Sequence, residues 1–287
     1  MPHLKSALLQ VHTAVFLFGL SGLFGKFLAL PAPVIVLGRT GFAALALGLV
    51  LVLGQRAARL RSPKDGLGMV LLGVLLAFHW VSFFRSIQLA TVAIGLLTFS
   101  SFPVFVTGLE PLLLKTPWRW RDGAIAALVV LGVALVIPDY RLGSATTLGA
   151  IWGLLSGLSF ALLQLFNKGY RQRYSALAIA FYQDLFACLS LMVVTPLAGL
   201  ALGTREVGLL MVLGVLCTAV AHTLFIESLA VLRTQTASVI SSLEPVYGVA
   251  LAALLLGELP SFRTLLGGSL IVGTTLWASW PAEQPNL

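Results

Sequence analysis

The chain repeats itself, and this duplication limits its fold more than any other feature does. In the second half, one long apolar stretch carries Glu227 and the next carries Glu244. A similar pair of apolar stretches occurs once before, in the first half. At a constant offset of 142 positions, Lys26 corresponds to Lys168, Arg85 to Glu227 and Pro103 to Pro245. A chain built from two copies of one module is expected to fold into two related halves.

The composition indicates what surrounds these halves. Hydrophobic residues make up 59% of the 287 residues and charged residues only 10%, and the mean hydropathy is +1.00. Soluble domains contain roughly 25% charged residues because their surface faces water. The surface of this chain must face lipid instead, so the sequence predicts an all-α integral membrane protein. The two cysteines, Cys188 and Cys217, fall inside apolar segments and are interpreted as packed thiols.

Ten apolar segments are predicted to be transmembrane helices, each near the ~20 residues that cross ~30 Å of hydrocarbon. The first is too long for a signal-peptide core and is expected to be retained. The link Pro138–Thr147 separates two five-helix repeats, 1–137 and 148–280. The predicted helices are Ala7–Leu28, Pro33–Leu53, Gly66–Gln88, Thr91–Leu114 and Gly123–Ile137, then Leu148–Lys168, Ser175–Pro196, Glu206–Leu229, Gln235–Gly257 and Thr264–Trp280.

The positive charges predict how the helices are oriented. With the N-terminus inside, twelve Lys and Arg residues fall in inner connectors and five in outer ones, while Arg39 lies within a helix. This bias predicts that both termini face the cytoplasm of a bacterial inner membrane. It also explains the net charge of +8 by the anionic inner leaflet rather than by a nucleic acid. Because each half has an odd number of spans, the halves are expected to insert in opposite orientations, as in many secondary transporters.

Matching residues mark corresponding helices in the two halves. They are Lys26 and Lys168 at the end of the first helix, Pro103 and Pro245 within the fourth, and Leu256-Gly257-Glu258 ahead of Gly267-Gly268. In this pattern the chain resembles the drug/metabolite transporter superfamily, specifically its EamA-type ten-helix branch. One departure is Lys115-Thr116-Pro117, where the second half has Gly257-Glu258-Leu259-Pro260. The resemblance implies two inverted five-helix repeats and, in most characterised members, export of amino acids, their derivatives or other small metabolites.

Ionisable side chains at membrane depth are costly and usually face a bundle interior, so they are the first candidates for binding residues. Glu244 precedes Pro245, which frees a backbone carbonyl about one turn earlier. This pair suits an amine or a cation, and an internal salt bridge is the alternative. His79 and Trp80 offer a titratable imidazole and an indole face, and the alternative is a histidine bonded to a carbonyl. His222 occupies the matching region of the second half.

Two arginines extend this set. Arg39 lies too deep to reach water easily, and its planar fork suits a substrate carboxylate, or it pairs with Asp184. Arg85 and Glu227 are predicted to lie near opposite mouths of one pathway, with simple snorkelling of Arg85 as the alternative. The full set of predicted substrate-binding residues is Arg39, His79, Trp80, Arg85, Gln164, Asn167, His222, Glu227 and Glu244.

The motifs that are missing narrow the function further. The sequence has no ATP-binding loop spacing and no hydrolase or zinc-protease motif, so neither a motor nor a cofactor is expected. We expect a secondary transporter that exports amino acids or amino-acid-derived metabolites, with an opine-type metallophore among them, by alternating access. Proton coupling through Glu244 or His79 is a further hypothesis. The alternative is an intramembrane enzyme that acts on a lipid-linked or small polar substrate; a channel suits proline-broken, duplicated helices less well.

Overall fold

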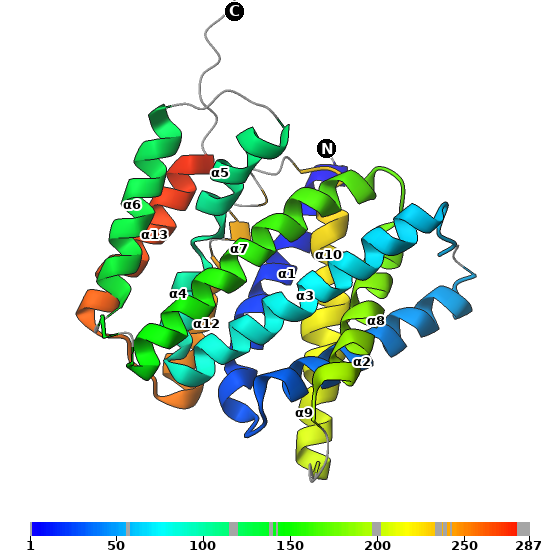
Figure 1. The fold of residues 1–287 in the computed structure, drawn as a ribbon, viewed down its shortest axis with the longest axis horizontal. Helices are drawn as coiled ribbons and strands as arrows, with labels where there is room; N and C mark the ends of the chain where they lie inside the picture. The colour runs from blue at the N-terminus through cyan, green and yellow to red at the C-terminus, as the bar shows by residue number, and fades with distance from the viewer. Residues whose placement is uncertain are drawn as a thin grey trace, which may run out of the picture.

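The computed structural model describes residues 2–55, 58–114, 120–137, 140–141, 143–196, 202–232, 237, 240–241 and 243–279. Throughout these residues the chain folds into helices joined by short connectors, without a strand (Figure 1). The elements are α1 (Pro2–Phe27), α2 (Ala32–Leu53), α3 (Pro63–Leu89), α4 (Val92–Phe99), α5 (Phe102–Leu114), α6 (Trp120–Val136), α7 (Ala145–Arg171), α8 (Ala176–Val194), α9 (Thr204–Gly214), the π-helix η1 (Val215–Val220), α10 (Ala221–Ser228), α12 (Glu244–Leu256) and α13 (Phe262–Ser279).

Several helices begin with a serine or threonine at the N-cap position. At four helices this side chain accepts a hydrogen bond from a backbone N–H in the first turn, which would otherwise lack an intrahelical partner. The caps are Ser62 before α3, Thr91 before α4, Ser144 before α7 and Ser175 before α8.

The predicted helix Thr91–Leu114 divides into α4 and α5. Pro103 has no backbone N–H, so a continuous helix would lose a hydrogen bond at this point. The hydroxyl groups of Ser100 and Ser101 donate to the carbonyls of Leu96 and Thr98, at 2.8 and 2.7 Å, and so satisfy the last turn of α4. The two helices still follow one another as a single apolar span over Val92–Leu109.

The predicted helix Glu206–Leu229 is also not uniform, because a six-residue π-helix separates α9 from α10. In this segment the hydroxyl of Thr218 donates to the carbonyl of Leu213 at 2.7 Å, five residues earlier. A π-helical turn widens the helix and commonly lies at a functional site. Much of the start of the predicted helix Gln235–Gly257 lies outside the described residues. The same is true of Lys115-Thr116-Pro117 in the first half and of Trp280.

If α4 with α5, and α9 with η1 and α10, are each counted as one span, the described helices form ten segments. Seven helices within the described residues are long and apolar enough to cross a membrane, and Gly123–Val136 and Glu244–Leu256 are shorter apolar helices. The predicted fold class is therefore confirmed.

The two halves interlock instead of forming separate lobes. Helix α3 packs against α7 and α8, α2 packs against α8 and α9, and α1 packs against α10 and α12. At the crossing of α1 and α12, a Cβ atom on Gly19 would lie 2.9 Å from the carbonyl oxygen of Glu244, so only glycine permits this approach. Helices α6 and α13 lie side by side at one edge (Figure 1). This arrangement brings α2, α3, α8, η1, α10 and α12 around a common centre.

Candidate functional site

Arg39 lies at this centre and is almost completely buried, at 1% exposure. Its Nε donates a hydrogen bond of 3.0 Å to the hydroxyl of Thr218, the residue that the π-helical turn presents. Its guanidinium carbon lies 3.8 Å from the centre of the Trp80 ring, in cation–π contact. Its Nη1 has no hydrogen-bond partner. One edge of the guanidinium is therefore fixed by the protein, and Nη1 remains available to an acceptor.

Asp184 on α8 is the most unusual neighbour of Arg39. It is fully buried, at 0% exposure, and neither carboxylate oxygen has a hydrogen-bond partner. Arg39 and Asp184 interact electrostatically, yet they form no direct ion pair among the described contacts. The Nδ1 atom of His222 lies 4.0 Å from Asp184 Oδ2, which is too long for a hydrogen bond. A buried carboxylate without partners is costly, and such a group is usually satisfied by a ligand or a proton.

Two further side chains complete what we call the central cluster, defined as Arg39, Trp80, Asp184, His222 and Glu244. The ring of His222 meets the Trp80 ring edge-on at 5.9 Å. Glu244 is the first residue of α12, is buried at 5% exposure and interacts electrostatically with Arg39. The cluster thus joins residues from α2, α3, α8, α10 and α12, which come from both halves of the chain.

His79 is held in a different environment from the central cluster. Its Nδ1 lies 3.0 Å from the Ser156 carbonyl oxygen and 2.9 Å from the Ser156 hydroxyl. Because a carbonyl only accepts, Nδ1 carries a hydrogen, and the imidazole has a protein partner. The ring stacks on Phe160 at 5.1 Å. These contacts match the alternative interpretation, a histidine bonded to a neighbouring carbonyl.

Gln164 and Asn167 form a polar stripe on α7 together with Arg171, since residues at this spacing share one helix face. Gln183, next to Asp184, donates to the Asn167 side-chain oxygen at 2.5 Å. The Nε2 atom of Gln164 and the Oε1 atom of Gln183 have no partner. Asn167 is thus linked to the residue next to Asp184.

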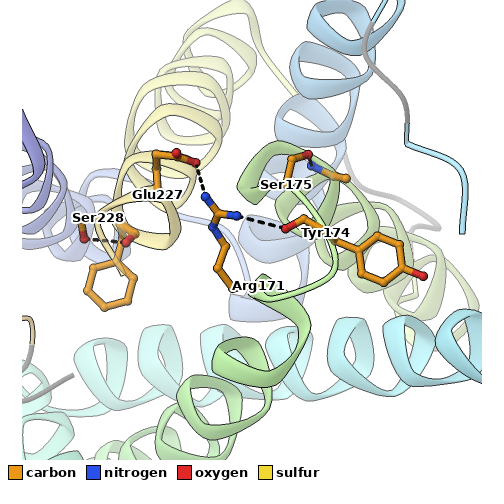
Figure 2. A network of polar contacts seen from close by, with 7 residues as sticks. Arg171, Tyr174, Ser175, Glu227 and Ser228 are labelled. Carbon is orange, nitrogen blue, oxygen red and sulfur yellow. Dashed lines mark hydrogen bonds and ion pairs between the residues drawn. The ribbon is translucent and has the colours of Figure 1, made fainter. Parts of the chain in front are cut away.

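Glu227 lies apart from the central cluster, at the C-terminal end of α10. Its carboxylate forms a 3.1 Å ion pair with Arg171, which also donates to the Tyr174 carbonyl at 3.3 Å (Figure 2). Arg85 is exposed near the end of α3. The structure therefore unites Arg39, Trp80, His222 and Glu244 of the predicted residues, and it places Arg85 and Glu227 elsewhere.

The far ends of α1 and α12 are held by a second ionic contact. Lys26 donates to the carbonyl of Ala90 at 2.8 Å and lies 3.8 Å from the Glu258 carboxylate. The other oxygen of Glu258 accepts a 2.9 Å hydrogen bond from the backbone N–H of Val92. Lys26 and Glu258 both belong to the sequence pattern on which the family resemblance rests. Their contacts join the end of α1 to the start of α4 and to the segment after α12.

Sequence reasoning missed three residues that shape this region: Thr218, Gln183 and Arg171. A small polar residue in an apolar span is common, so Thr218 and Gln183 gave no signal of their own. Arg171 was counted only as a positive charge in an inner connector. Asp184 was considered, but only as an ion-pair partner for Arg39.

Comparison with known proteins agrees with the fold. The sequence matches the EamA-like transporter family twice, over residues 5–137 and 147–280. It is 27% identical to an uncharacterized transporter, YxxF, of Bacillus subtilis over 271 residues, which cover 92% of this chain and 86% of the relative. It is 24% identical over 215 residues to a Rickettsia conorii protein named S-adenosylmethionine uptake transporter, covering 75% and 72% of the two chains.

A solved crystal structure superposes with a TM-score of 0.65 at 17% sequence identity and covers 94% of this chain and 95% of the other. At this identity the likeness concerns the fold alone. The family match extends over both halves, and it confirms the resemblance inferred from the repeated residues. The chain belongs to the EamA-like transporter family and is an all-helical membrane protein with the two-repeat architecture of that family.

Proposed function

We propose that this protein is a secondary carrier for an amino-acid-derived metabolite, which binds at the central cluster. The proposal rests on one observation: the buried central cluster contains a positive and a negative side chain, Arg39 and Asp184, whose polar atoms are not fully satisfied by the protein. Nη1 of Arg39 and both oxygens of Asp184 lack hydrogen-bond partners, and the two residues are among the most deeply buried polar groups. A carboxylate bound to Arg39 and an ammonium group bound to Asp184 would satisfy both, as an α-amino acid head group does.

The relatives support this substrate class and add a probe. Four Rickettsia relatives, at 22–24% identity, carry the name S-adenosylmethionine uptake transporter, and that molecule has an amino acid head group. Export from the bacterial cytoplasm and uptake are two directions of one carrier, because gradients set the net flux of a secondary transporter. Repeats 1–137 and 148–280, inserted in opposite orientations, would provide the alternating access, with proton coupling through the central cluster.

The proposal is tested with purified protein in sealed proteoliposomes. The panel contains neutral amino acids, arginine, S-adenosylmethionine and a histidine-derived opine. At least one of them is expected to show saturable uptake and counterflow, and Arg39→Gln is expected to abolish both. Arg205→Gln serves as a matched control because Arg205 is exposed and its contacts, an ion pair with Glu206 and a hydrogen bond to the Phe27 carbonyl, lie outside the central cluster. Flux without counterflow would favour a channel, and substrate turnover without a sealed vesicle would favour an intramembrane enzyme.

A further inference from the structure

The charges of the central cluster do not balance. Arg39 supplies one permanent positive charge, since a guanidinium does not lose its proton in proteins. Asp184 and Glu244 supply two carboxylates, and both interact electrostatically with Arg39. If both carboxylates are ionised and His222 is neutral, the group carries one net negative charge. The other groups at this level are Cys188 on α8, Cys217 on η1, His79 on α3, and the amides Gln164 and Asn167 on α7.

An excess charge in this position is unfavourable because no water reaches it. Asp184 is fully buried, and a buried, unpaired carboxylate strongly destabilises the folded protein. His79 does not supply the missing charge, because its Nδ1 is engaged by Ser156. His222 is placed differently: its Nδ1 has no hydrogen-bond partner and faces Asp184 Oδ2 at 4.0 Å. Asp184 and His222 together are thus the part of the cluster best suited to hold one added positive charge.

We infer that the central site selects amino-acid-type substrates that carry one net positive charge. In the empty carrier, one proton shared by Asp184 and His222 supplies this positive charge instead of the substrate. The inference rests on the function proposed above and deepens it. The substrate carboxylate binds Nη1 of Arg39, while its two cationic groups face Asp184 and Glu244. As the substrate enters, the proton leaves the Asp184–His222 pair for water, so the site holds the same net charge before and after. Transport is then an electroneutral exchange of a cation for a proton.

The first test compares pairs of similar ligands in which one member carries an additional positive charge. S-adenosylmethionine and S-adenosylhomocysteine differ by a methyl group and a positive charge, and arginine and citrulline are nearly isosteric. Binding is measured by calorimetry on the purified protein, and proton release by a pH indicator in weak buffer. The charged member of at least one pair is expected to bind at least roughly tenfold more tightly and to release one proton. Equal affinity within both pairs would overturn the inference.

The second test changes the charge of the site. Asp184→Asn brings the cluster to zero net charge, so the preference for the charged ligand is expected to disappear together with proton release. Glu244→Gln is expected to act in the same direction. Glu206→Gln is the matched control, because Glu206 pairs with the exposed Arg205 outside the cluster, and it should keep the preference. Retained binding of the neutral ligand shows that each variant is folded.

The outcomes separate this inference from the proposed function. If Asp184→Asn and Glu244→Gln leave charge preference and proton release unchanged, the inference is wrong. If neutral amino acids are carried with full dependence on Arg39 while cations are not, the carrier function stands and the charge selection is wrong. If no member of the panel binds, both are contradicted.

Discussion

The hydroxyl of Thr218 determines how Arg39 is presented, because it accepts the Nε–H while donating to the Leu213 carbonyl. Thr218→Val keeps the shape and removes the acceptor, so the guanidinium is no longer fixed on that edge. A hydrogen bond to a charged group contributes about 1.5–3 kcal/mol, so substrate affinity is expected to fall roughly tenfold or more. Thr218→Ser retains the hydroxyl and should bind normally. Equal affinity in both variants would mean that the Trp80 contact alone positions Arg39.

Substitution of Arg39 distinguishes a substrate-binding role from a purely structural one, in which Arg39 would only hold α2 against α8 through Asp184. Arg39→Lys keeps the charge but loses the planar fork, so affinity for a carboxylated cargo should fall roughly tenfold, about 1.4 kcal/mol, in equilibrium binding. The amidated analogue should be unaffected. The exposed Arg85 provides the control Arg85→Lys, which should leave both ligands unchanged. Equal losses for both cargoes in Arg39→Lys would indicate a purely structural role.

The residue types in the sequence indicated which side chains could bind a substrate, but not which of them contact one another. Arg39, His222 and Glu244 could be recognised because a charged or titratable group inside an apolar span is itself unusual. The separation of Arg39 from Asp184 could not be predicted, because it depends on how α2 and α8 cross. His79 and His222 look equivalent in the sequence, and their neighbours distinguish them, because His79 is bonded to Ser156 and His222 faces Asp184.

At the scale of elements, α10 connects the site with one end of the bundle. It carries His222 in the central cluster and Glu227 in the ion pair with Arg171, and it follows the π-helix η1. We predict that this pair must open during each cycle. Arg171→Cys with Glu227→Cys, in a background without Cys188 and Cys217, should lose transport when a short thiol crosslinker joins them and regain it when a reducible linker is cleaved.

A neighbouring ion pair on the same end of α7 provides the control for this crosslink. Arg173 lies 2.8 Å from Asp65 and joins the turn after α7 to the start of α3, without contacting α10. Arg173→Cys with Asp65→Cys, crosslinked in the same way, is expected to leave transport largely intact. Full activity of the crosslinked Arg171–Glu227 pair would mean that α10 does not move relative to α7.

Apolar periodicity predicted the spans but not their internal breaks. The division into α4 and α5 follows from Pro103 and the hydroxyl groups before it, which a hydropathy pattern does not register. The π-helix η1 cannot be recognised from composition, because one additional residue in a helical turn leaves the segment as apolar as before. The close approach at Gly19 depends on α12, far away in sequence, so it too could not be located from the chain alone.

At the scale of the whole molecule, the ionic contacts lie at opposite ends of the bundle. The C-terminal ends of α1 and α12 lie at the bottom of Figure 1, and the C-terminal end of α10 lies at the top. Lys26, in the last turn of α1, pairs with Glu258, which follows α12, and Glu227 of α10 pairs with Arg171. Both ion pairs are formed in this structure, in which the central cluster is buried. Alternating access requires that these contacts open in turn, since opening both would leave a continuous path for the substrate.

The orientation of this bundle in the membrane is the last prediction. Twelve Lys and Arg residues lie in one set of connectors against five in the other. This bias predicts that the Arg171–Glu227 end faces the cytoplasm, because positive connectors are retained on that side. A reporter fused at Leu287 should therefore be active inside, and one inserted near Ser144, before α7, should be active outside. The first fusion tests the side of the termini, and the second tests the odd number of spans in the first half. A cytoplasmic signal at Ser144 would contradict the inverted repeat, because α7 would then enter the membrane from the same side as α1.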